Sequence, residues 1–266
     1  MAALDLARTA KVVYAIWYRE MVRFVRDRSR WVGMILQPLL YLLLVGYGIA
    51  HSMSFRGGAV AGVDYLTFMY PGIVGMSVMF TAIFSGVGII WDREFGFLKE
   101  VLVAPVSRAA VALGKAFGIA SLVVCQSAVL LALAPVAHVR LGVGRVLGLL
   151  GVCALIAFAL GSLGIFLAAR LQSMEGFQLV MNVLTMPMFF LSGALYPLRG
   201  LPAWLEVLAH VDPLTYGIDA LRNVLYSVHQ AAHLLVQYDV GLDLGITAAL
   251  AVVLTALGAW AFEAQP

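Results

Sequence analysis

Charge is scarce in this chain of 266 residues. Only 12% of the residues are Asp, Glu, Lys or Arg, compared with about 25% in an average soluble domain. By contrast, 63% are hydrophobic and the mean hydropathy is +0.98. This composition excludes an ordinary water-soluble domain and indicates an integral membrane protein.

Acidic residues are also missing from the interior of the long apolar runs. A carboxylate inside the membrane is the usual proton or sodium relay of an ion-driven transporter. Its absence argues against an ion-driven transporter or channel that works alone. The chain also lacks a phosphate-binding loop, because Gly114–Lys115 has no Gly five residues before it and no Ser or Thr after it. An ATP-driven protein of this kind would need a separate ATPase subunit.

No set of catalytic or metal-binding residues is evident. The two cysteines, Cys125 and Cys153, lack CxxC spacing and are expected to pack in the core. His229 and His233 have helical spacing but no HExxH glutamate between them, which favours surface histidines over a metal site. A membrane enzyme acting on lipids is therefore disfavoured. The net charge of +3 is scattered, so no nucleic-acid partner is expected.

Six apolar runs are long enough to cross a hydrocarbon layer of about 30 Å as helices. They cover residues of about 31–50, 65–90, 109–136, 146–169, 177–196 and 242–262. We therefore expect an all-α membrane protein with one six-span domain over residues 31–266. Gly75, Gly86 and Gly88 should permit kinks and close helix approach, Ser107 should cap the third span, and Pro187 should break the fifth.

Residues 1–30 are amphipathic rather than uniformly apolar. Arg19, Arg23, Arg26 and Arg30 recur at helical spacing on one side, and the opposite side carries Val13, Ile16, Trp17, Met21 and Phe24. This pattern predicts a helix in the membrane interface, with its arginines toward lipid headgroups or a partner. A simple basic anchor before the first span is the alternative.

The distribution of basic residues predicts the orientation. With the N-terminus in the cytoplasm, 12 of the 17 Lys and Arg residues lie inside, as the positive-inside bias prefers. Both termini and the loop between the second and third spans are then cytoplasmic.

Residues 91–115 form a charged stretch between two runs without charge. Its charges alternate with apolar residues such as Phe95 and Phe97, and Pro105 ends any helix begun at Asp92. We expect a short amphipathic helix in water, at the membrane surface, that contacts a soluble partner.

Residues 197–240 contain no apolar run long enough to cross. Two amphipathic segments, 203–209 and 214–228, are expected to dip into the outer leaflet or cover the outer face. The polar residues inside the spans, Gln37, Gln126, Asn182 and Ser192, are expected to form hydrogen bonds between helices. In the alternative, a lateral cleft for an amphipathic substrate is lined by Gln37, Asn182, Tyr41, Phe80, Phe84, Phe189 and Phe190.

Three segments together resemble a known family. They are YPGIVGMSVMFTAIFSGVGIIWDREFGFLKEVLVAPVSRAAVALGKA at 70–116, FFLSGALYPLRGLPAWL at 189–205 and DPLTYGIDALR at 212–222. In this order they resemble the membrane subunits of ABC-2 type exporters, and most of all the daunorubicin-resistance and nodulation-factor export branch. The resemblance covers essentially the whole chain.

The resemblance implies a six-span half-transporter that pairs with itself or a related permease and docks two ATPase subunits. ATP and Mg²⁺ would be bound by those subunits, and no cofactor by this chain. A coupling helix at 92–102 would contact the ATPase through Asp92, Arg93, Glu94, Phe97, Lys99 and Glu100. Residues 11–30 would form the interface helix beside it, and 197–226 an outer-leaflet hairpin with signature residues Pro213, Tyr216 and Arg222.

The expected function is export of an amphipathic compound, such as a drug, lipid or glycoconjugate, across a prokaryotic cytoplasmic membrane. Export of a polysaccharide or O-antigen by the same family is the alternative.

Overall fold

The computed structural model describes residues 2–48, 59–60, 63–96, 107–171, 173–198, 200–226 and 235–263. This part of the chain is almost entirely helical, with one short hairpin of two-residue strands, β1 (Ala59–Val60) and β2 (Val63–Asp64). Five of its helices are long and apolar enough to cross a membrane, and the number is six if residues 9–26 and 31–46, which are bent by 69° relative to each other, count together as one span.

The long helices follow the predicted spans closely. The second span consists of α4 (Tyr65–Phe84) and α5 (Val87–Glu94), the third is α7 (Arg108–Ala132), and the fourth is α8 (Val143–Arg170). The fifth is α9 (Met174–Leu191) and the sixth is α13 (Val240–Glu263). The predicted cap of the third span is confirmed, because Ser107 Oγ accepts a hydrogen bond from the Ala110 N–H. Pro187, expected to break the fifth span, lies inside α9.

The first span begins with α2 (Arg28–Leu40) and continues in a π-helical segment, η1 (Tyr41–Gly46). Pro38 lies inside α2 and has no N–H to bond the carbonyl of Met34, four residues earlier. That carbonyl instead accepts a hydrogen bond of 3.1 Å from Gln126 Nε2 on α7. The prediction that Gln126 bonds a neighbouring helix is therefore confirmed.

A second proline repeats this arrangement. Pro71 lies inside α4 and leaves the carbonyl of Thr67 without a helical partner. The hydroxyl of Tyr226 donates to that carbonyl at 2.6 Å. Each of these prolines thus leaves a carbonyl in its own span that accepts a hydrogen bond from a side chain on another helix.

Helix α8 lies at the centre of the bundle, against α4, α5, α7, α11 and α13. Where the second span is interrupted between α4 and α5, at Ser85–Gly86, its backbone lies very close to that of α8. A Cβ at Gly86 would lie 2.5 Å from the carbonyl oxygen of Gly164 on α8, and one at Gly164 would lie 2.4 Å from that of Ile83. The predicted close approach at Gly86 is confirmed, whereas a Cβ at Gly88 would meet no atom closer than 4.0 Å.

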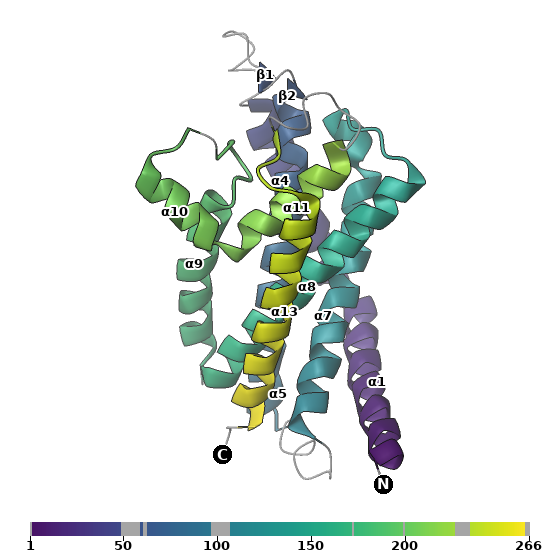
Figure 1. Ribbon diagram of the computed structural model, residues 1–266. Coiled ribbons are helices and arrows are strands. Elements are labelled where there is room, and N and C mark those ends of the chain that lie inside the picture. The colour runs from purple at the N-terminus through teal and green to yellow at the C-terminus, as the bar shows by residue number, and fades with distance from the viewer. Residues whose placement is uncertain are drawn as a thin grey trace.

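The ends of the bundle differ (Figure 1). One end of the bundle holds the start of α1 and the last turn of α13. The same end of the bundle holds the C-terminal turn of α5 and the first turn of α7. The β hairpin lies at the other end, and η2 (Ala134–Ala137, 3₁₀) follows α7. This grouping agrees with the predicted arrangement, in which both termini and the loop after the second span share one side.

The segment between the fifth and sixth spans forms α10 (Ala203–Val211) and α11 (Pro213–Tyr226), close to the predicted bounds. Its position differs from the prediction, because α11 is a core element rather than a cover. Leu214, Ile218 and Leu221 on α11 are fully buried against neighbouring spans, whereas Trp204 and Val207 on α10 are exposed. Of the two cysteines expected in the core, Cys153 is buried and Cys125 is exposed.

The contact between Gly86 and Gly164 gives a direct test of the fold. Gly164→Ala places a methyl group against backbone atoms that cannot move aside, so we expect unfolding about 3–10 °C lower in detergent. Gly151→Ala, on the same helix with open space around the new methyl, should leave the unfolding temperature unchanged or slightly raised. Equal unfolding temperatures for the two variants would contradict the close approach.

Candidate functional site

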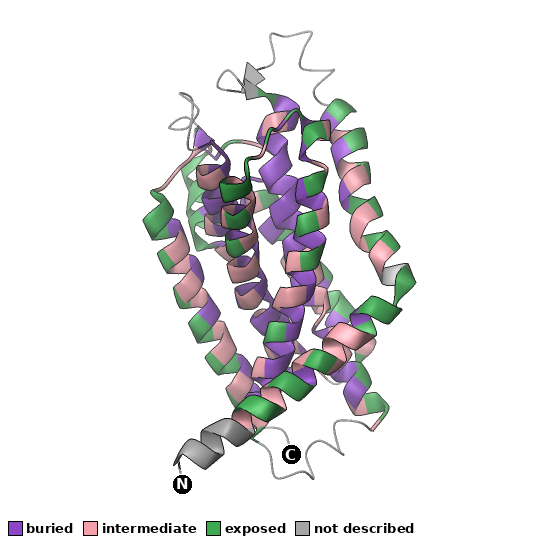
Figure 2. Ribbon diagram, turned by 90° about the vertical axis from the view of Figure 1, so that its right-hand side faces the viewer, coloured by how far each residue is buried: buried purple, intermediate pink, exposed green. Residues whose placement is uncertain are grey.

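Five charged side chains from three helices meet near the end of the bundle that carries the termini. Arg19, Glu20 and Arg23 come from α1 (Ala2–Arg26), Asp92 from the end of α5, and Lys115 from the second turn of α7. We call these five residues the charge cluster. Figure 2 shows α1 crossing this end of the bundle obliquely before the chain turns into α2.

Asp92 is the centre of the charge cluster. Its Oδ2 lies 2.6 Å from both Arg19 Nη2 and Lys115 Nζ, and its Oδ1 lies 3.8 Å from Arg23 Nη1. Glu20 Oε1 lies 2.9 Å from Arg19 Nη2 and 3.3 Å from Lys115 Nζ. Because Asp92 and Lys115 are only 5% and 4% exposed, each would be a costly buried charge without its partners in the cluster.

Small residues let α1 reach α7 at this level. A Cβ at Gly114 would lie 2.8 Å from the Ile16 side chain, and one at Gly118 would lie 2.9 Å from Glu20. The GxxxG spacing of these glycines on either side of Lys115 is the signal that could have predicted a helix contact there. The Trp17 indole strengthens the contact by donating to Ser121 Oγ at 2.9 Å.

The predicted coupling residues have separate positions. Asp92 belongs to the charge cluster, and Arg93 donates to the carbonyls of Leu171 and Ala168, at 2.9 and 3.0 Å, where α8 ends. The prediction that a separate helix in water begins at Asp92 is wrong, because α5 continues to Glu94 and buries Asp92. Glu94 is exposed, and Phe97, Lys99 and Glu100 lie outside the described residues.

The arginines of the predicted interface helix are also divided. Arg19 and Arg23 join the charge cluster, and the Arg23 guanidinium stacks over Trp91 at 5.2 Å. Arg26 is exposed, and Arg30 falls in α2, with its side chain outside the described part. The apolar side of α1 is confirmed in part, since Ile16 and Phe24 are buried, although they pack on protein rather than lipid.

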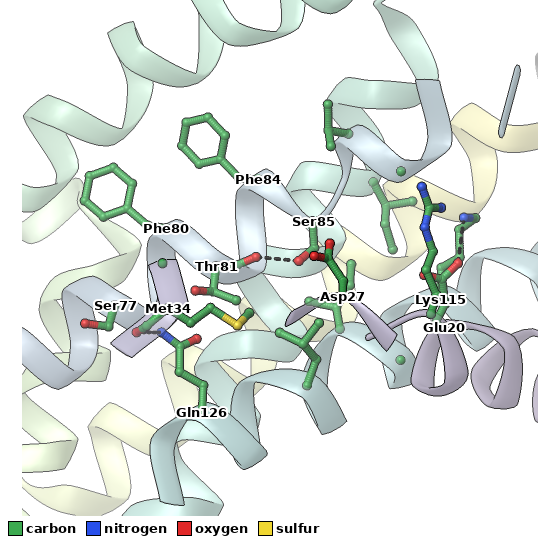
Figure 3. A pocket seen from close by; sticks show the side chains of 18 of the residues that line it. Glu20, Asp27, Met34, Ser77, Phe80, Thr81, Phe84, Ser85, Lys115 and Gln126 are labelled. Atoms are coloured by element: carbon green, nitrogen blue, oxygen red, sulfur yellow. Dashed lines mark hydrogen bonds and ion pairs between the residues drawn. The ribbon is translucent and has the colours of Figure 1, made fainter. Parts of the chain in front are cut away.

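A cavity of about 600 Å³ lies directly beside the charge cluster, between α1, α2, α4, α5 and α7. Three charge-cluster residues, Glu20, Arg23 and Lys115, line one end of it. Figure 3 shows Ser77, Phe80 and Gln126 toward the opposite end. Lys115 and Gln126 are eleven residues apart on α7, so the lining extends about 16 Å along that helix.

The predicted lateral cleft corresponds only partly to this cavity. Gln37, Phe80 and Phe84 line it. Tyr41 instead packs edge-on against Phe189, with ring centroids 6.3 Å apart, and Phe190 is exposed. Asn182 is exposed on α9, away from the cavity, and Ser192 Oγ bonds its own helix at the Phe189 carbonyl.

The signature residues of the hairpin have structural partners. Pro213 begins α11, and the Tyr216 hydroxyl donates to the His210 carbonyl at 2.8 Å. Arg222 is 3% exposed, donates to the Gly193 carbonyl at 2.5 Å and lies over the Phe68 ring at 4.4 Å. Arg222 therefore joins α11 to α4 and to the turn after α9.

Asp212 lies at the start of α11, where its Oδ1 accepts from the Leu214 N–H at 3.0 Å. Burial raises the pKa of Asp212 to about 7, although the hydrogen bonds from Leu214 and Thr215 oppose the shift. His229 and His233 lie outside the described residues, and among those described no three His, Cys, Asp or Glu side chains form a metal-binding group.

The charge cluster can be tested by a double-mutant cycle. Asp92→Leu or Lys115→Met alone removes the nearest partner of a buried charge, which keeps only Glu20 or the two arginines, and should cost up to about 3–5 kcal/mol of stability. The double variant should lose clearly less unfolding free energy than the sum of the two single losses. We expect a coupling energy of at least about 1 kcal/mol, measured by denaturant unfolding. Glu94→Gln, at the exposed end of the same helix, should change stability by less than about 0.5 kcal/mol. Additive effects would contradict direct pairing.

Asp212 predicts a pH dependence. Between its ordinary value of 3.8 and about 7, the folded chain keeps a proton that the unfolded chain has lost, so stability falls as pH rises through this window. Asp212→Asn keeps an oxygen that can cap α11 but cannot ionise, so its unfolding temperature should fall less between pH 4.5 and 7.5. Glu206→Gln, exposed on α10, should retain the wild-type slope. An unchanged slope in Asp212→Asn would refute the assignment.

Comparison with known proteins supplies the family. The family model described as ABC-2 type transporter matches residues 11–226, which include α11 and every member of the charge cluster.

Named relatives match over most of their length. A putative transport permease ycf38 of Cyanophora paradoxa is 32% identical over 218 residues, covering 81% of this chain and 74% of the relative. Nodulation protein J of Rhizobium leguminosarum bv. trifolii is 28% identical, with coverages of 79% and 80%. The inner membrane transport permease YadH of Escherichia coli is 27% identical, with coverages of 78% and 80%. The chain therefore belongs to the ABC-2 type transporter family, as a multi-pass membrane permease.

Proposed function

We propose that this chain is the permease subunit of an ATP-driven exporter, which moves an amphipathic compound out of the cytoplasm or inner leaflet. A separate subunit binds and hydrolyses ATP with Mg²⁺. The observation that carries the proposal is the charge cluster, because it joins α1, α5 and α7 and also lines one end of the cavity. Any displacement of α1 or of the α5 end must therefore move the cavity wall.

The exposed side of α1 suits contact with the ATPase subunit. Tyr14 and Tyr18 are 62% and 56% exposed and have stacked rings, and Arg26 lies exposed two turns beyond Tyr18. Tyrosine and arginine are enriched among the residues that contribute most to protein interfaces. We assign the remaining contacts to Glu94, Phe97, Lys99 and Glu100, since Asp92 and Arg93 already have partners inside the bundle.

The cavity lining favours an amphipathic cargo. Apolar walls from Phe80, Phe84 and Ile119 alternate with polar groups such as Gln37 and Thr81, and charged groups lie at one end. Its volume of about 600 Å³ is typical of sites for single small molecules, which favours a drug, lipid or short glycoconjugate over a polymer.

Pairing with a second permease fits the surface of α9. Asn182 lies exposed in the middle of this span, beside exposed Leu179, Val183 and Met186. A polar amide that faces lipid has no hydrogen-bond partner there, which is unfavourable. A hydrogen bond from this amide to a second span removes that cost. We assign this surface to a homodimer, or to a dimer with a related permease.

We place the protein in the cytoplasmic membrane of a prokaryote, with both termini and the charge cluster toward the cytoplasm. The excess of Lys and Arg at that end supports this orientation, and one relative carries the name of an inner membrane permease.

The ATPase contact is tested by exchanging charges outside the described residues. In Lys99→Glu/Glu100→Lys, membrane insertion should be normal, but co-purified ATPase activity and ATP-dependent uptake of a fluorescent lipid into inside-out vesicles should fall at least tenfold. Arg140→Glu reverses an exposed charge at the opposite end and should retain both activities. Full uptake by the double variant, or uptake by the purified chain alone, would refute the scheme.

A further inference from the structure

The side-chain amide of Gln126 has a defined orientation. Gln126 is 3% exposed, and its Nε2 donates to the Met34 carbonyl at 3.1 Å. That carbonyl is free because Pro38 has no N–H, and a carbonyl can only accept. The NH₂ group of the amide must therefore face Met34, which leaves Oε1 pointing elsewhere.

The Oε1 atom of Gln126 is buried without a hydrogen-bond partner among the described residues. Gln126 lines the cavity, and Figure 3 shows its amide near Met34 and Ser77. Neighbouring atoms cover this oxygen, so a cargo in the cavity must move them aside to reach it. A buried acceptor left unpaired is unfavourable, and a donor that reaches it would therefore be bound preferentially.

The surroundings of Gln126 offer acceptors next to apolar surface. The Ser77 hydroxyl donates to the Ile73 carbonyl at 2.7 Å, so toward the cavity its oxygen can only accept. The rings of Phe80 and Phe84 stack 6.1 Å apart on the neighbouring wall. The charged groups lie about 16 Å away along α7, where Glu20 and Lys115 already pair with each other.

We propose that Gln126 determines substrate specificity by accepting a hydrogen bond from a neutral donor on the cargo, either a hydroxyl or an amide N–H. The apolar part of the same molecule lies against Phe80 and Phe84. This inference rests on the proposed export of an amphipathic compound and names the chemical group by which that compound is recognised.

Binding to the full chain in nanodiscs, without ATP or partner, tests this assignment. The first pair of ligands is a fluorescent alkyl glucoside and its tetra-O-methyl derivative. The second is a fluorescent N-alkylacetamide and its N-methyl derivative. In at least one pair, wild type should bind the donor-bearing member about fivefold or more tightly, after subtraction of binding to empty nanodiscs. The pair that discriminates identifies the donor as hydroxyl or amide.

Two variants separate recognition from helix packing. Gln126→Leu removes the acceptor together with one interhelical hydrogen bond, and its preference should fall below about twofold. Thr255→Val removes a different interhelical hydrogen bond, the 2.8 Å contact with Ser162, which lies outside the cavity lining. It should keep the wild-type preference.

Equal binding within both ligand pairs would overturn the inference, and would be the result if a retained water satisfies Oε1. A preference that Gln126→Leu preserves would also overturn it, as would a failure of every ligand to bind. Loss of the preference in Thr255→Val as well would also overturn it, because general packing would then be the cause. Failure of ATP-dependent efflux would count against the proposed function, while a Gln126-dependent preference would still stand.

Discussion

The pairing of Asp92 with Lys115 and Arg19 is the constraint on which the functional end of this structure depends. Each group comes from a different helix, and the two most buried could not keep their charges alone. The pairing therefore fixes α1 against the ends of the second and third spans. It also accounts for the close approach at Gly114 and Gly118, since α1 must come near enough for Glu20 to reach Lys115.

A second constraint is that a membrane offers no water to satisfy a free backbone carbonyl. Pro38 and Pro71 each free one carbonyl, and in both cases a side chain from another helix takes its place, Gln126 for Met34 and Tyr226 for Thr67. These prolines thus act as points of attachment between helices. At Gln126 the hydrogen bond also fixes the orientation of the amide, with Nε2 toward Met34 and Oε1 left without a partner among the described residues. The proline in α2 and the proposed specificity of the site therefore have the same origin.

Much of the fold could be predicted because hydropathy depends on local composition. Each predicted span that the structure describes matches a helix within a few residues, apart from the last turn of the fifth, and the amphipathic face of α1 was predicted from residue spacing. The site was predicted less well. Gln37, Phe80 and Phe84 line the cavity, but Tyr41, Asn182 and Phe189 do not, because helical rotation and packing decide which side of a span faces inward. Asp92 was assigned to a surface helix, since its charge suggested water and its partner Lys115 is 23 residues away.

By itself the sequence determined the membrane class, the bounds of most of the long apolar helices, the amphipathic N-terminal helix and the family, all of which follow from local composition and motifs. Only the tertiary structure decided that α11 is buried, that Asp92 has its partners inside the bundle and that Gln126, beside a cavity, has a buried oxygen without a partner among the described residues. The physical reason is that buried charges and unpaired polar atoms acquire their energies from neighbours far away in the chain. No local pattern specifies those neighbours until the helices are packed.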